Sequence, residues 1–437
     1  HRRAQRSADS HHHTFPMKVL VIGSGGREHA IVDALAESSE VRKIYSAPGN
    51  GGIRQQAELV SVASDDVRGL LEFARAQRID LTFVGPEGPL SKGVVDLFRQ
   101  AGLAIVGPSA DQARLESSKI YAKQFFKANK IPTADFWECA TSNEAYEVLE
   151  QVDYPIVVKA DGLAAGKGVT IAETRDEARK AVHDFMEART LGDAGSKLVI
   201  EQFLQGDEAS FHVFVDGTTF QPMVAAQDHK RRFDGDTGPN TGGMGAYSTD
   251  TILGPAQYDA VLTHIIYPTL QAAKSYSGIL YAGLMLTDDG PKLLEYNARF
   301  GDPETQVILS RLKTNLLDVL VDIAEHRLSS RKLEWRPDAA ATVVLVASGY
   351  PGKVESGKPI SGLDEAKRIE GVKVHHAGTR WEDGKVYTAG GRILNVTARG
   401  STLAEALERA YFVAEMIEFD GKAFRKDIGK RGLSKQK

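Results

Sequence analysis

Short apolar runs alternate with amphipathic, helical stretches over the first part of the chain, and each run ends in a loop rich in glycine or proline. This alternation predicts parallel strands separated by helices, with the loops gathered at one edge of the sheet. The expected strands are 18–22, 44–46, 81–84 and 104–106. We place this N-terminal parallel α/β domain at residues 17–118.

The pattern becomes antiparallel in the middle of the chain. Two strands, 155–159 and 169–172, are joined by a glycine-rich loop in the manner of a hairpin. Further strands are expected at 197–201, 209–215, 222–226, 281–286 and 292–297, the last two connected by a turn at Asp288-Asp289-Gly290. We therefore predict a central α+β domain over residues 119–335.

The last part of the chain is again rich in predicted strands and closes with one amphipathic helix. Ser401 and Thr402 precede that helix and can cap its first turn. Its apolar face packs on a core and consists of Leu403, Ala406, Leu407, Ala410 and Val413. A small, strand-rich C-terminal domain is expected at 336–431.

Length and composition narrow the class of protein. A chain of 437 residues is too long for a single core, and its net charge of -4 gives no general attraction to nucleic acid or to anionic membranes. No run approaches the roughly 20 apolar residues of a membrane span, and the single Cys139 can form no internal disulfide. These features predict a cytoplasmic protein without nucleic-acid or membrane partners.

The first 16 residues are basic and polar and lack the apolar core of an export signal. His11, His12 and His13 stand side by side just before the first predicted strand. Adjacent histidines in this position favour an expression remnant or a loose leader over a metal site. We therefore exclude residues 1–16 from the predicted fold.

Two glycine-rich segments could bind phosphate. The turn between the first strand and helix exposes backbone amides at Gly25 and Gly26, with Arg27 next to them. A dinucleotide site is a weak alternative, because Glu28 occupies the place of the third glycine and the second strand lacks a ribose-binding acid. The turn remains a candidate for binding a phosphate group, and a tight structural turn is the plainer interpretation.

The second segment, 162–168, imitates a P-loop but is one residue too short and has Gly168 where a metal-binding hydroxyl should stand. A glycine-rich loop between antiparallel strands can instead fold over a nucleotide. Lys159 ends the preceding apolar strand, where an unpaired ammonium is costly, so we expect it to pair with a phosphate. Lys167 could equally be a solvated side chain.

A third constellation follows the strand at 292–297. Glu295 and Asn297 project from one face because alternate residues of a strand share a face, and Arg299 follows if the strand persists. Carboxylate and amide oxygens suit magnesium, and a guanidinium suits the charge of a transferring phosphoryl group. The simpler interpretation is a sheet face with a salt bridge, but a buried strand would carry valines at these positions.

These segments resemble the ATP-grasp superfamily and, within it, the phosphoribosylamine:glycine ligase family. The resemblance runs from Met17 almost to the end of the chain, in strings that are far more specific than one glycine motif. The strings are VLVIGSGGREHA, APGNGG, LTFVGPEGPL, SSKIYAKQF, VVKADGLAAGKGV, GDEASF, QDHKR, DTGPNTGGMGAYS, LEYNARFGDPETQ, HAGT and RKDIG.

The resemblance implies a carbon–nitrogen ligase of purine biosynthesis that converts glycine, 5-phosphoribosylamine and ATP to glycinamide ribonucleotide, ADP and phosphate, with Mg2+ or Mn2+. It also implies a central ATP-grasp fold with a mobile lid at about 137–206 and a possible transient contact with the enzyme that supplies phosphoribosylamine. No protein nucleophile is required, in agreement with the lack of a recognisable triad.

The resemblance assigns roles by position. Lys159 and Arg299 are the implied catalytic residues, and Glu295 and Asn297 the metal ligands. ATP-binding residues are Lys119, Lys159, Gly162, Gly166, Lys167, Gly168, Glu201, Leu204 and Glu208, of which Glu201 and Leu204 receive the adenine and Glu208 the ribose. The ribose phosphate of the amine would meet Gly25, Gly26, Pro48, Gly49 and Asn50, and the rest of the acceptor site is Asp228, His229, Lys230, Asn240, Thr241, Gly242 and Gly243.

The pattern departs from many ATP-grasp enzymes at the strand 281–286, which carries no acidic residue for a second metal. His229 could be a hydrogen-bonding support, and we do not assign it as a general base. The alternatives are a ligase or carboxylase acting on another purine intermediate, which the QDHKR and TGGMGAYS strings disfavour, and a catalytically silent nucleotide-binding or scaffold protein. Retention of Lys159, Glu295, Asn297 and Arg299 disfavours the latter.

Overall fold

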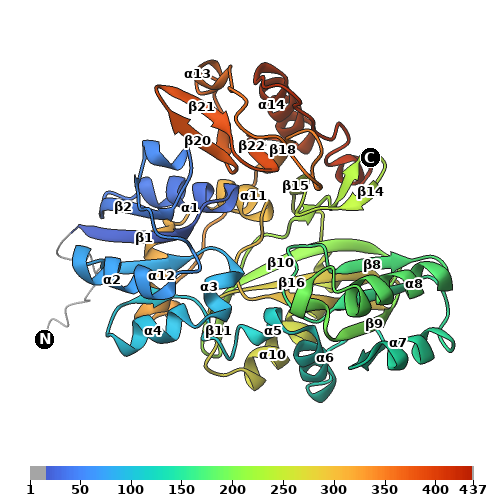
Figure 1. Cartoon of the computed structure of the whole chain (residues 1–437). Helices are drawn as coiled ribbons and strands as arrows, with labels where there is room; N and C mark the ends of the chain where they lie inside the picture. The colour runs from blue at the N-terminus through green and yellow to red at the C-terminus, as the bar shows by residue number, and fades with distance from the viewer. Residues whose placement is uncertain (1–15, 436–437) are drawn as a thin grey trace, which may run out of the picture.

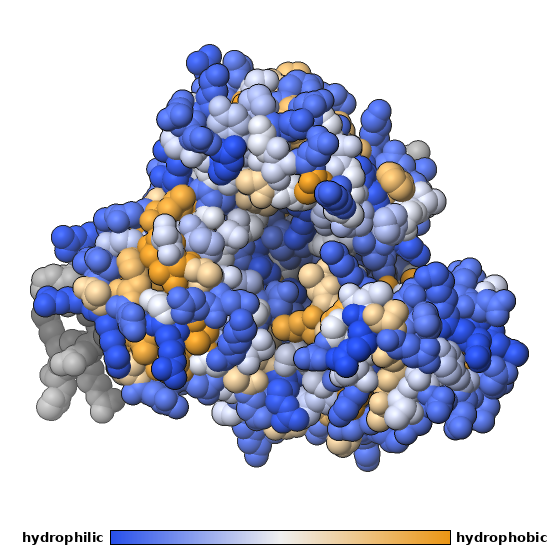
Figure 2. All heavy atoms as spheres, in the orientation of Figure 1, coloured by the Kyte–Doolittle hydropathy of each residue, from blue (hydrophilic) through white to orange (hydrophobic). Residues whose placement is uncertain are grey.

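The computed structural model describes residues 16–435, so the prediction for residues 1–15 lies outside the described residues. Figure 1 shows an N-terminal lobe, a central body that extends into a second lobe around α7 and α8, and a C-terminal lobe above both. Figure 2 shows a hollow lined by hydrophilic residues where the C-terminal lobe meets the other parts. The mixed, multi-domain α/β and α+β architecture predicted from the sequence is confirmed.

The N-terminal lobe contains a five-stranded parallel sheet in the order β3-β2-β1-β4-β5. Its strands are β1 (Met17–Gly23), β2 (Val41–Pro48), β3 (Glu58–Leu59), β4 (Leu81–Val84) and β5 (Ile105–Val106). The strands are almost wholly apolar at their centres because helices cover both faces of the sheet.

Neighbouring residues of β1 belong to different apolar clusters. Leu20 lies in a cluster with residues of α2 and α4, whereas Val19 lies in one with α1 and with the much later α12. This follows from the pleat, which turns successive side chains to opposite faces. The covering helices are α1 (Gly26–Ala36), α2 (Val67–Gln77), α3 (Glu87–Ser91), α4 (Val94–Gln100) and α12 (Leu316–Ala324).

The lobe on the right of Figure 1 has its own small core. Its four antiparallel strands follow the order β6-β9-β7-β8, and β7 and β8 pair as the hairpin that the sequence predicted. The strands are β6 (Phe136–Cys139), β7 (Ile156–Ala160), β8 (Val169–Ala172) and β9 (Leu198–Gln202), packed with α7 (Ser142–Leu149) and α8 (Arg175–Val182). The apolar core of this lobe is therefore separate from the clusters of the other lobes.

The central sheet is antiparallel, in the order β11-β10-β16-β17. Its strands are β10 (Asp207–Asp216), β11 (Thr219–Pro222), β16 (Ser277–Thr287) and β17 (Gly290–Asn297). The strand predicted at 222–226 is wrong: β11 ends at Pro222, and beyond it Ala226 makes a single bridge to Ser210. The strand expected at 292–297 forms as β17 and ends at Asn297, so the condition under which Arg299 would share its face is not met.

The C-terminal sheet recruits two strands from the middle of the chain, in the order β12-β15-β18-β22-β19. Its strands are β12 (Gln227–Asp228), β15 (Gly245–Ser248), β18 (Ala339–Val346), β19 (Val372–His376) and β22 (Arg392–Gly400). The helix α14 (Leu403–Met416) packs on β18 and β22, and Thr402 caps it by accepting the Glu405 N–H. The candidate acceptor residues 228–243 therefore start and end beside strands of the C-terminal sheet.

Short elements complete the fold. They are η1 (Ile53–Gln55), α5 (Arg114–Ser117), α6 (Lys119–Ala128), η2 (His183–Glu187), η3 (Gly192–Gly195), β13 (Arg231–Phe233), β14 (Thr237–Asn240), α9 (Pro255–Val261), η4 (Leu262–Ile266), α10 (Tyr267–Ala272), α11 (Glu304–Arg311), η5 (Leu328–Ser330), α13 (Leu363–Ala366), β20 (Thr379–Glu382), β21 (Lys385–Thr388) and α15 (Lys430–Ser434). Within residues 16–435, no helix is both long enough and apolar enough to cross a membrane.

Candidate active site

A buried carboxylate pairs with two lysines at the base of the lid. Glu201 of β9 forms ion pairs with Lys159 Nζ at 2.6 Å and with Lys123 Nζ at 2.8 Å, and all three side chains are buried. Burial opposes the charge of Lys159, but Glu201 and Glu295 outweigh it and raise its pKa. Lys159 is thus held charged at the end of β7, and Lys123, which the sequence analysis missed, shares its partner. The signal for Lys123 was its place within the SSKIYAKQF string.

Glu295 of β17 lies within a group of cations from separate segments. Burial raises the pKa of Glu295, but Lys230, Lys159, Lys119 and Arg299 together hold it below its usual range. The pKa of Lys119 is lowered, chiefly by burial. Lys159, Lys230 and Arg299 each pair with another carboxylate as well, so a triphosphate at this site would meet cations that are already held in place.

Arg299 joins the central sheet to the N-terminal lobe. Its guanidinium contacts Glu116 at 2.7 Å and Glu87 at 3.2 Å, and donates to Asn297 Oδ1 at 3.3 Å. The Arg299 charge lowers the pKa of Glu87 to about 2, whereas burial raises that of Glu116. Arg299 reaches Asn297 by turning back from the loop after β17, not by sharing its strand face.

The oxygen atoms of Glu295 and Asn297 fit a magnesium ion that also binds nucleotide phosphates. The two residues lie on one side of β17, and Tyr296 between them is buried on the other. Magnesium is usually held by one or two carboxylates together with substrate phosphates and water. Among residues 16–435, no group of three or more His, Cys, Asp or Glu side chains could hold a metal by itself, so the nucleotide would have to supply further ligands.

Leu204 lies between β9 and β10. It forms a small apolar cluster with Ala134 and Met285, against which Leu294 packs. An apolar surface of this kind suits an adenine ring. Glu208, at the start of β10, forms an ion pair of 3.4 Å with Lys230.

Two carboxyl groups face each other on the acceptor side. Burial, together with Glu304 and Glu208, raises the pKa of Asp228 to about 8 in spite of Lys230. One oxygen of Glu304 accepts from Tyr281 OH at 3.0 Å, and the other is buried with no donor among the described residues. A protonated Asp228 would supply that donor. The sequence analysis did not single out Glu304 or Tyr281, although both lie in segments it discussed.

His229 supports the C-terminal lobe. Its Nε2 accepts from the Gly429 N–H at 3.2 Å, and its backbone bonds to Met244 and Gly245. Burial lowers its pKa to about 4, so the ring is neutral near pH 7. A neutral ring whose Nε2 already accepts a backbone N–H is poorly placed to act as a general base.

The first-domain residues are more enclosed than the sequence suggested. All four hydrogen-bonding positions of the Asn50 amide are used: it donates to Ser24 and His376 carbonyls and accepts from Gly52 and Ile53. Carboxylates already accept from two amides of the glycine turn, Glu28 from Gly25 N–H at 2.9 Å and Asp302 from Arg27 N–H at 3.3 Å. Pro48 and Gly49 are half-buried next to them, and Gly49 N–H bonds to Gly23.

The glycine-rich loops of the lid and of the acceptor side meet. A Cβ atom placed on Gly166 would lie 3.4 Å from the Thr241 carbonyl oxygen. Lys167 is exposed, whereas Gly168 is buried, and a Cβ on Gly162 would lie 2.8 Å from the backbone of Ala194. After Asn240, the last residue of β14, Thr241 bonds to the Lys230 carbonyl through both its N–H and its hydroxyl.

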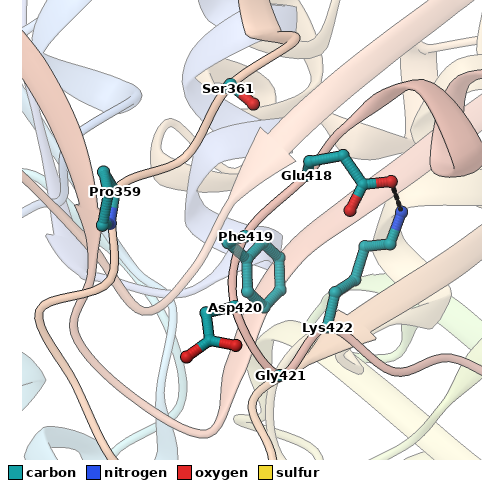
Figure 3. Close-up of a pocket in the computed structure, with 7 residues that line it drawn as sticks. All are labelled: Pro359, Ser361, Glu418, Phe419, Asp420, Gly421 and Lys422. Atoms are coloured by element: carbon teal, nitrogen blue, oxygen red, sulfur yellow. Dashed lines mark hydrogen bonds and ion pairs between the residues drawn. The ribbon is translucent and has the colours of Figure 1, made fainter.

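A separate surface pocket lies on the C-terminal lobe (Figure 3) and is lined by residues between Pro359 and Lys422. Its only lining cation, Lys422, pairs with Glu418 and caps the end of α14 by donating to the Ala414 and Ile417 carbonyls. None of the candidate site residues lines this pocket.

An antiparallel sheet that carries a glutamate and an asparagine, faced by a small lobe with a glycine-rich hairpin loop and a buried lysine, defines the ATP-grasp class of nucleotide-using enzymes. Residues 117–305 match the ATP-grasp (A) domain of phosphoribosylglycinamide synthetase, residues 17–116 its N domain and residues 340–431 its C domain. The chain belongs to the phosphoribosylglycinamide synthetase family.

Curated relatives and solved structures agree with this assignment. The chain is 48% identical to phosphoribosylamine–glycine ligase of Escherichia coli over 96% of this chain and 100% of the relative, and 47% identical to that of Vibrio parahaemolyticus over 96% and 99%. The crystal structure of phosphoribosylamine–glycine ligase from Thermotoga maritima aligns with a TM-score of 0.82 at 34% identity, covering 94% of this chain and 100% of that one. A biotin carboxylase from Campylobacter jejuni shares the fold at 16% identity and a TM-score of 0.72, covering 93% and 92%.

Proposed function

We propose that this chain joins glycine to the amine of 5-phosphoribosylamine with conversion of ATP to ADP and phosphate, as a carbon–nitrogen ligase of purine biosynthesis. The observation that carries the proposal is the match of all three family domains. Ligases of this name are also 47% and 48% identical to the chain over 96% of its length. The convergence of Lys119, Lys159, Lys230 and Arg299 on Glu295 supports it.

The reaction takes place in two displacements. A carboxylate oxygen of glycine attacks the γ-phosphorus of ATP, the bond to the β–γ bridging oxygen breaks, and ADP leaves with the electron pair. The amine nitrogen of phosphoribosylamine then attacks the carbonyl carbon of glycyl phosphate. The carbon–oxygen bond to the phosphate breaks, phosphate leaves, and the nitrogen loses a proton.

The residues of the chain would bind and orient these groups. Lys119 and Lys159 would neutralise ATP phosphates beneath the loop that contains Gly162, Gly166, Lys167 and Gly168, with Glu201, Leu204 and Glu208 around the nucleoside. Arg299 would stabilise the charge of the transferring phosphoryl group, since a buried guanidinium fixed by two carboxylates is already oriented.

Glu295 and Asn297 would hold Mg2+ or Mn2+, which supplies charge neutralisation to the phosphates when bound. Asp228, Lys230 and Asn240 to Gly243 would line the acceptor side, with His229 as a support. The first-domain residues Gly25, Gly26, Pro48, Gly49 and Asn50 would lie towards the ribose phosphate, Asn50 by shaping the loop because its amide is fully engaged.

The proposal extends to the organisation and setting of the enzyme. We divide the chain at 17–118, 119–335 and 336–431, with the lid at about 137–206. We place the enzyme in the cytoplasm, where a transient contact with the enzyme that supplies phosphoribosylamine would shorten the exposure of this unstable amine to water.

A coupled assay of ADP release tests the function. ADP should form only when glycine, freshly formed phosphoribosylamine, ATP and Mg2+ are all present, and omission of any one should reduce the rate to background. Product analysis should find glycinamide ribonucleotide in amounts equal to ADP. ADP formation that ignores glycine or the amine, or that requires a different acid, would overturn the proposal.

A further inference from the structure

Arg392, the first residue of β22, reaches from the C-terminal lobe into the candidate acceptor site. Its Nη1 donates to the carbonyl oxygens of Gly242 at 3.0 Å, Gly243 at 3.5 Å and Asp302 at 3.0 Å. Its Nη2 lies 3.7 Å from the Asp302 carboxylate, and its side chain is 23% exposed. One guanidinium therefore ties the acceptor loop to the loop that follows β17.

A second residue of the C-terminal lobe contacts the N–H of the same glycine. The Gly242 N–H donates to Tyr350 OH at 3.1 Å, and the Tyr350 carbonyl accepts from Arg232 at 3.0 Å. A Cβ on Gly391 would lie 2.4 Å from the Tyr350 ring, so that ring packs directly on the backbone before Arg392. Gly242 is thus fixed through both its N–H and its C=O.

The fixed loop is also the surface that the lid touches. Gly166, in the glycine-rich lid loop, lies against the Thr241 carbonyl, the peptide unit immediately before Gly242. The Gly243 N–H donates to the Thr241 hydroxyl at 3.0 Å, which makes Thr241 to Gly243 a compact turn. A continuous set of contacts therefore runs from the lid loop through this turn to Arg392.

We propose that Arg392 is a positioning residue for the ligase reaction: its guanidinium fixes the turn Thr241 to Gly243 as the surface on which the glycine-rich lid loop closes over ATP. The C-terminal lobe would thereby help to enclose the nucleotide. Arg392 itself would contact neither ATP nor the metal. The kinetic test of this inference rests on the proposed function, because it measures ADP release in the ligase reaction.

The test compares Arg392→Met, Arg392→Lys and Tyr350→Phe with a matched control, Arg399→Met. Arg399 belongs to the same strand but pairs with Asp338 at 3.3 Å on the surface of the lobe. For Arg392→Met, kcat for ADP release should fall roughly 10- to 100-fold, the range expected when reacting groups are misplaced by about 1 Å. Arg392→Lys should fall between it and the wild type, because lysine keeps the positive charge but lacks the planar fork of guanidinium donors.

A second readout reports the lid without turnover. Lys167 is exposed in the lid loop, so trypsin should cut there in the free enzyme, and a non-hydrolysable ATP analogue with Mg2+ should protect it. This protection should be weaker in Arg392→Met than in the wild type and unchanged in Arg399→Met. Thermal unfolding midpoints of the two variants should be similar.

The outcomes separate the inference from the function and from a merely structural role. Wild-type kcat in Arg392→Met, full nucleotide protection of Lys167, or an activity loss that matches the fraction unfolded would each overturn the inference. If the wild type itself fails to couple ADP release to glycine and the amine, the proposed function falls, whereas the protection experiment still decides the role of Arg392.

Discussion

Arg299 shows how a single side chain can carry several tasks at the site. Its guanidinium is shared among Glu87, Glu116 and Asn297, and this arrangement depends on a planar fork with several donors. The contacts come from α3 and α5 of the N-terminal domain and from β17. The residue therefore fixes where the ends of three segments meet.

Arg299→Lys should lower kcat for ADP release about 100-fold or more, as loss of one oriented donor to a transition state typically does. The lysine keeps the positive charge, so the buried Glu87 and Glu116 are not left without a cation. Circular dichroism and gel filtration of the variant should match the wild type. Wild-type turnover in a folded Arg299→Lys protein would contradict the role given to this side chain.

The Asp228–Glu304 pair predicts a dependence of stability on pH. The pKa of Asp228 is raised from its ordinary value to about 8 in the folded protein, so the folded state binds more protons than the unfolded state between about pH 4 and pH 8. The stability contributed by this proton is present below the unfolded pKa and is lost as the pH rises towards 8.

Asp228→Asn should therefore raise the thermal midpoint relative to the wild type at pH 9 more than at pH 5, since it removes the buried negative charge and leaves an N–H donor for Glu304. Differential scanning fluorimetry of both proteins across this range measures the difference. If the difference in thermal midpoint between the two proteins stays constant with pH, Asp228 does not carry the additional proton in the folded state.

Local sequence patterns indicated candidate site residues but not the partners of those residues. Lys159, Glu295 and Asn297 stand in local patterns that indicate their chemistry. Glu201 as the partner of Lys159 depends on the pairing of β7 with β9. Tyr281 as the partner of Glu304 depends on where the start of α11 lies relative to β16. Spacing along one strand reports which residues share a face, but not which side chain of another strand lies opposite.

At the scale of elements, strand positions were predictable wherever turn residues bounded an apolar run. The hairpin at Asp288 to Gly290 and the capped helix after Thr402 formed as expected. β12 is only two residues long and gives no alternation signal, so its pairing with β15 inside the C-terminal sheet could not be foreseen. The strand predicted at 222–226 starts where β11 ends, because β11 spans only Thr219–Pro222.

Two glycines of the lid can be compared to test the contact between the glycine-rich loop and the acceptor turn. Gly166 and Gly192 both adopt positive φ, of 79° and 59°, but a Cβ on Gly192 meets nothing within 4 Å, whereas one on Gly166 reaches Thr241. Alanine costs about 1 kcal/mol in such a conformation at either site. Only Gly166→Ala also changes the contact between the lid and the acceptor turn.

Gly166→Ala should lower kcat/KM for ATP by about tenfold, equivalent to about 1.4 kcal/mol of transition-state stabilisation. Gly192→Ala should remain within about twofold of the wild type while losing similar thermal stability. Steady-state ADP release and thermal unfolding of both variants decide the point. Equal kinetic losses in the two variants would show that backbone strain, and not the contact with Thr241, controls the lid.

At the scale of the whole molecule, the lobes are joined by polar contacts that no local pattern announces. Arg392 and Gly242 are 150 residues apart in the chain, and His29 and His376 are 347 apart. The predicted domains were continuous stretches of sequence, yet α12 covers the N-terminal sheet and β12 and β15 belong to the C-terminal one. Periodicity identifies an amphipathic element but does not say which core receives its apolar face.

A histidine cluster fastens the N-terminal lobe to the C-terminal lobe. The His376 N–H donates to His29 Nδ1 at 2.7 Å, and Asp33 lies 3.0 Å from His375 Nε2 and 3.6 Å from His29 Nε2. Burial lowers the pKa of His29 to about 4, and burial and the neighbouring imidazoles lower that of His376. Both rings are therefore neutral near pH 7, and His29 Nδ1 accepts a bond that a protonated ring could not.

This cluster should make the union of the two lobes sensitive to acid. The unfolded state binds more protons than the folded state between about pH 6.5 and pH 4, so the stability from these histidines is complete above pH 6.5 and is lost as the pH falls towards 4. His29→Asn keeps an acceptor near the position of Nδ1 but cannot titrate. The decline of the thermal midpoint from pH 7 to pH 5 should be shallower in His29→Asn than in the wild type, and unchanged in His326→Asn, whose parent side chain is exposed and paired with Asp216. If the two variants have equal slopes, the acid sensitivity arises elsewhere and the histidines only fill the space between the lobes.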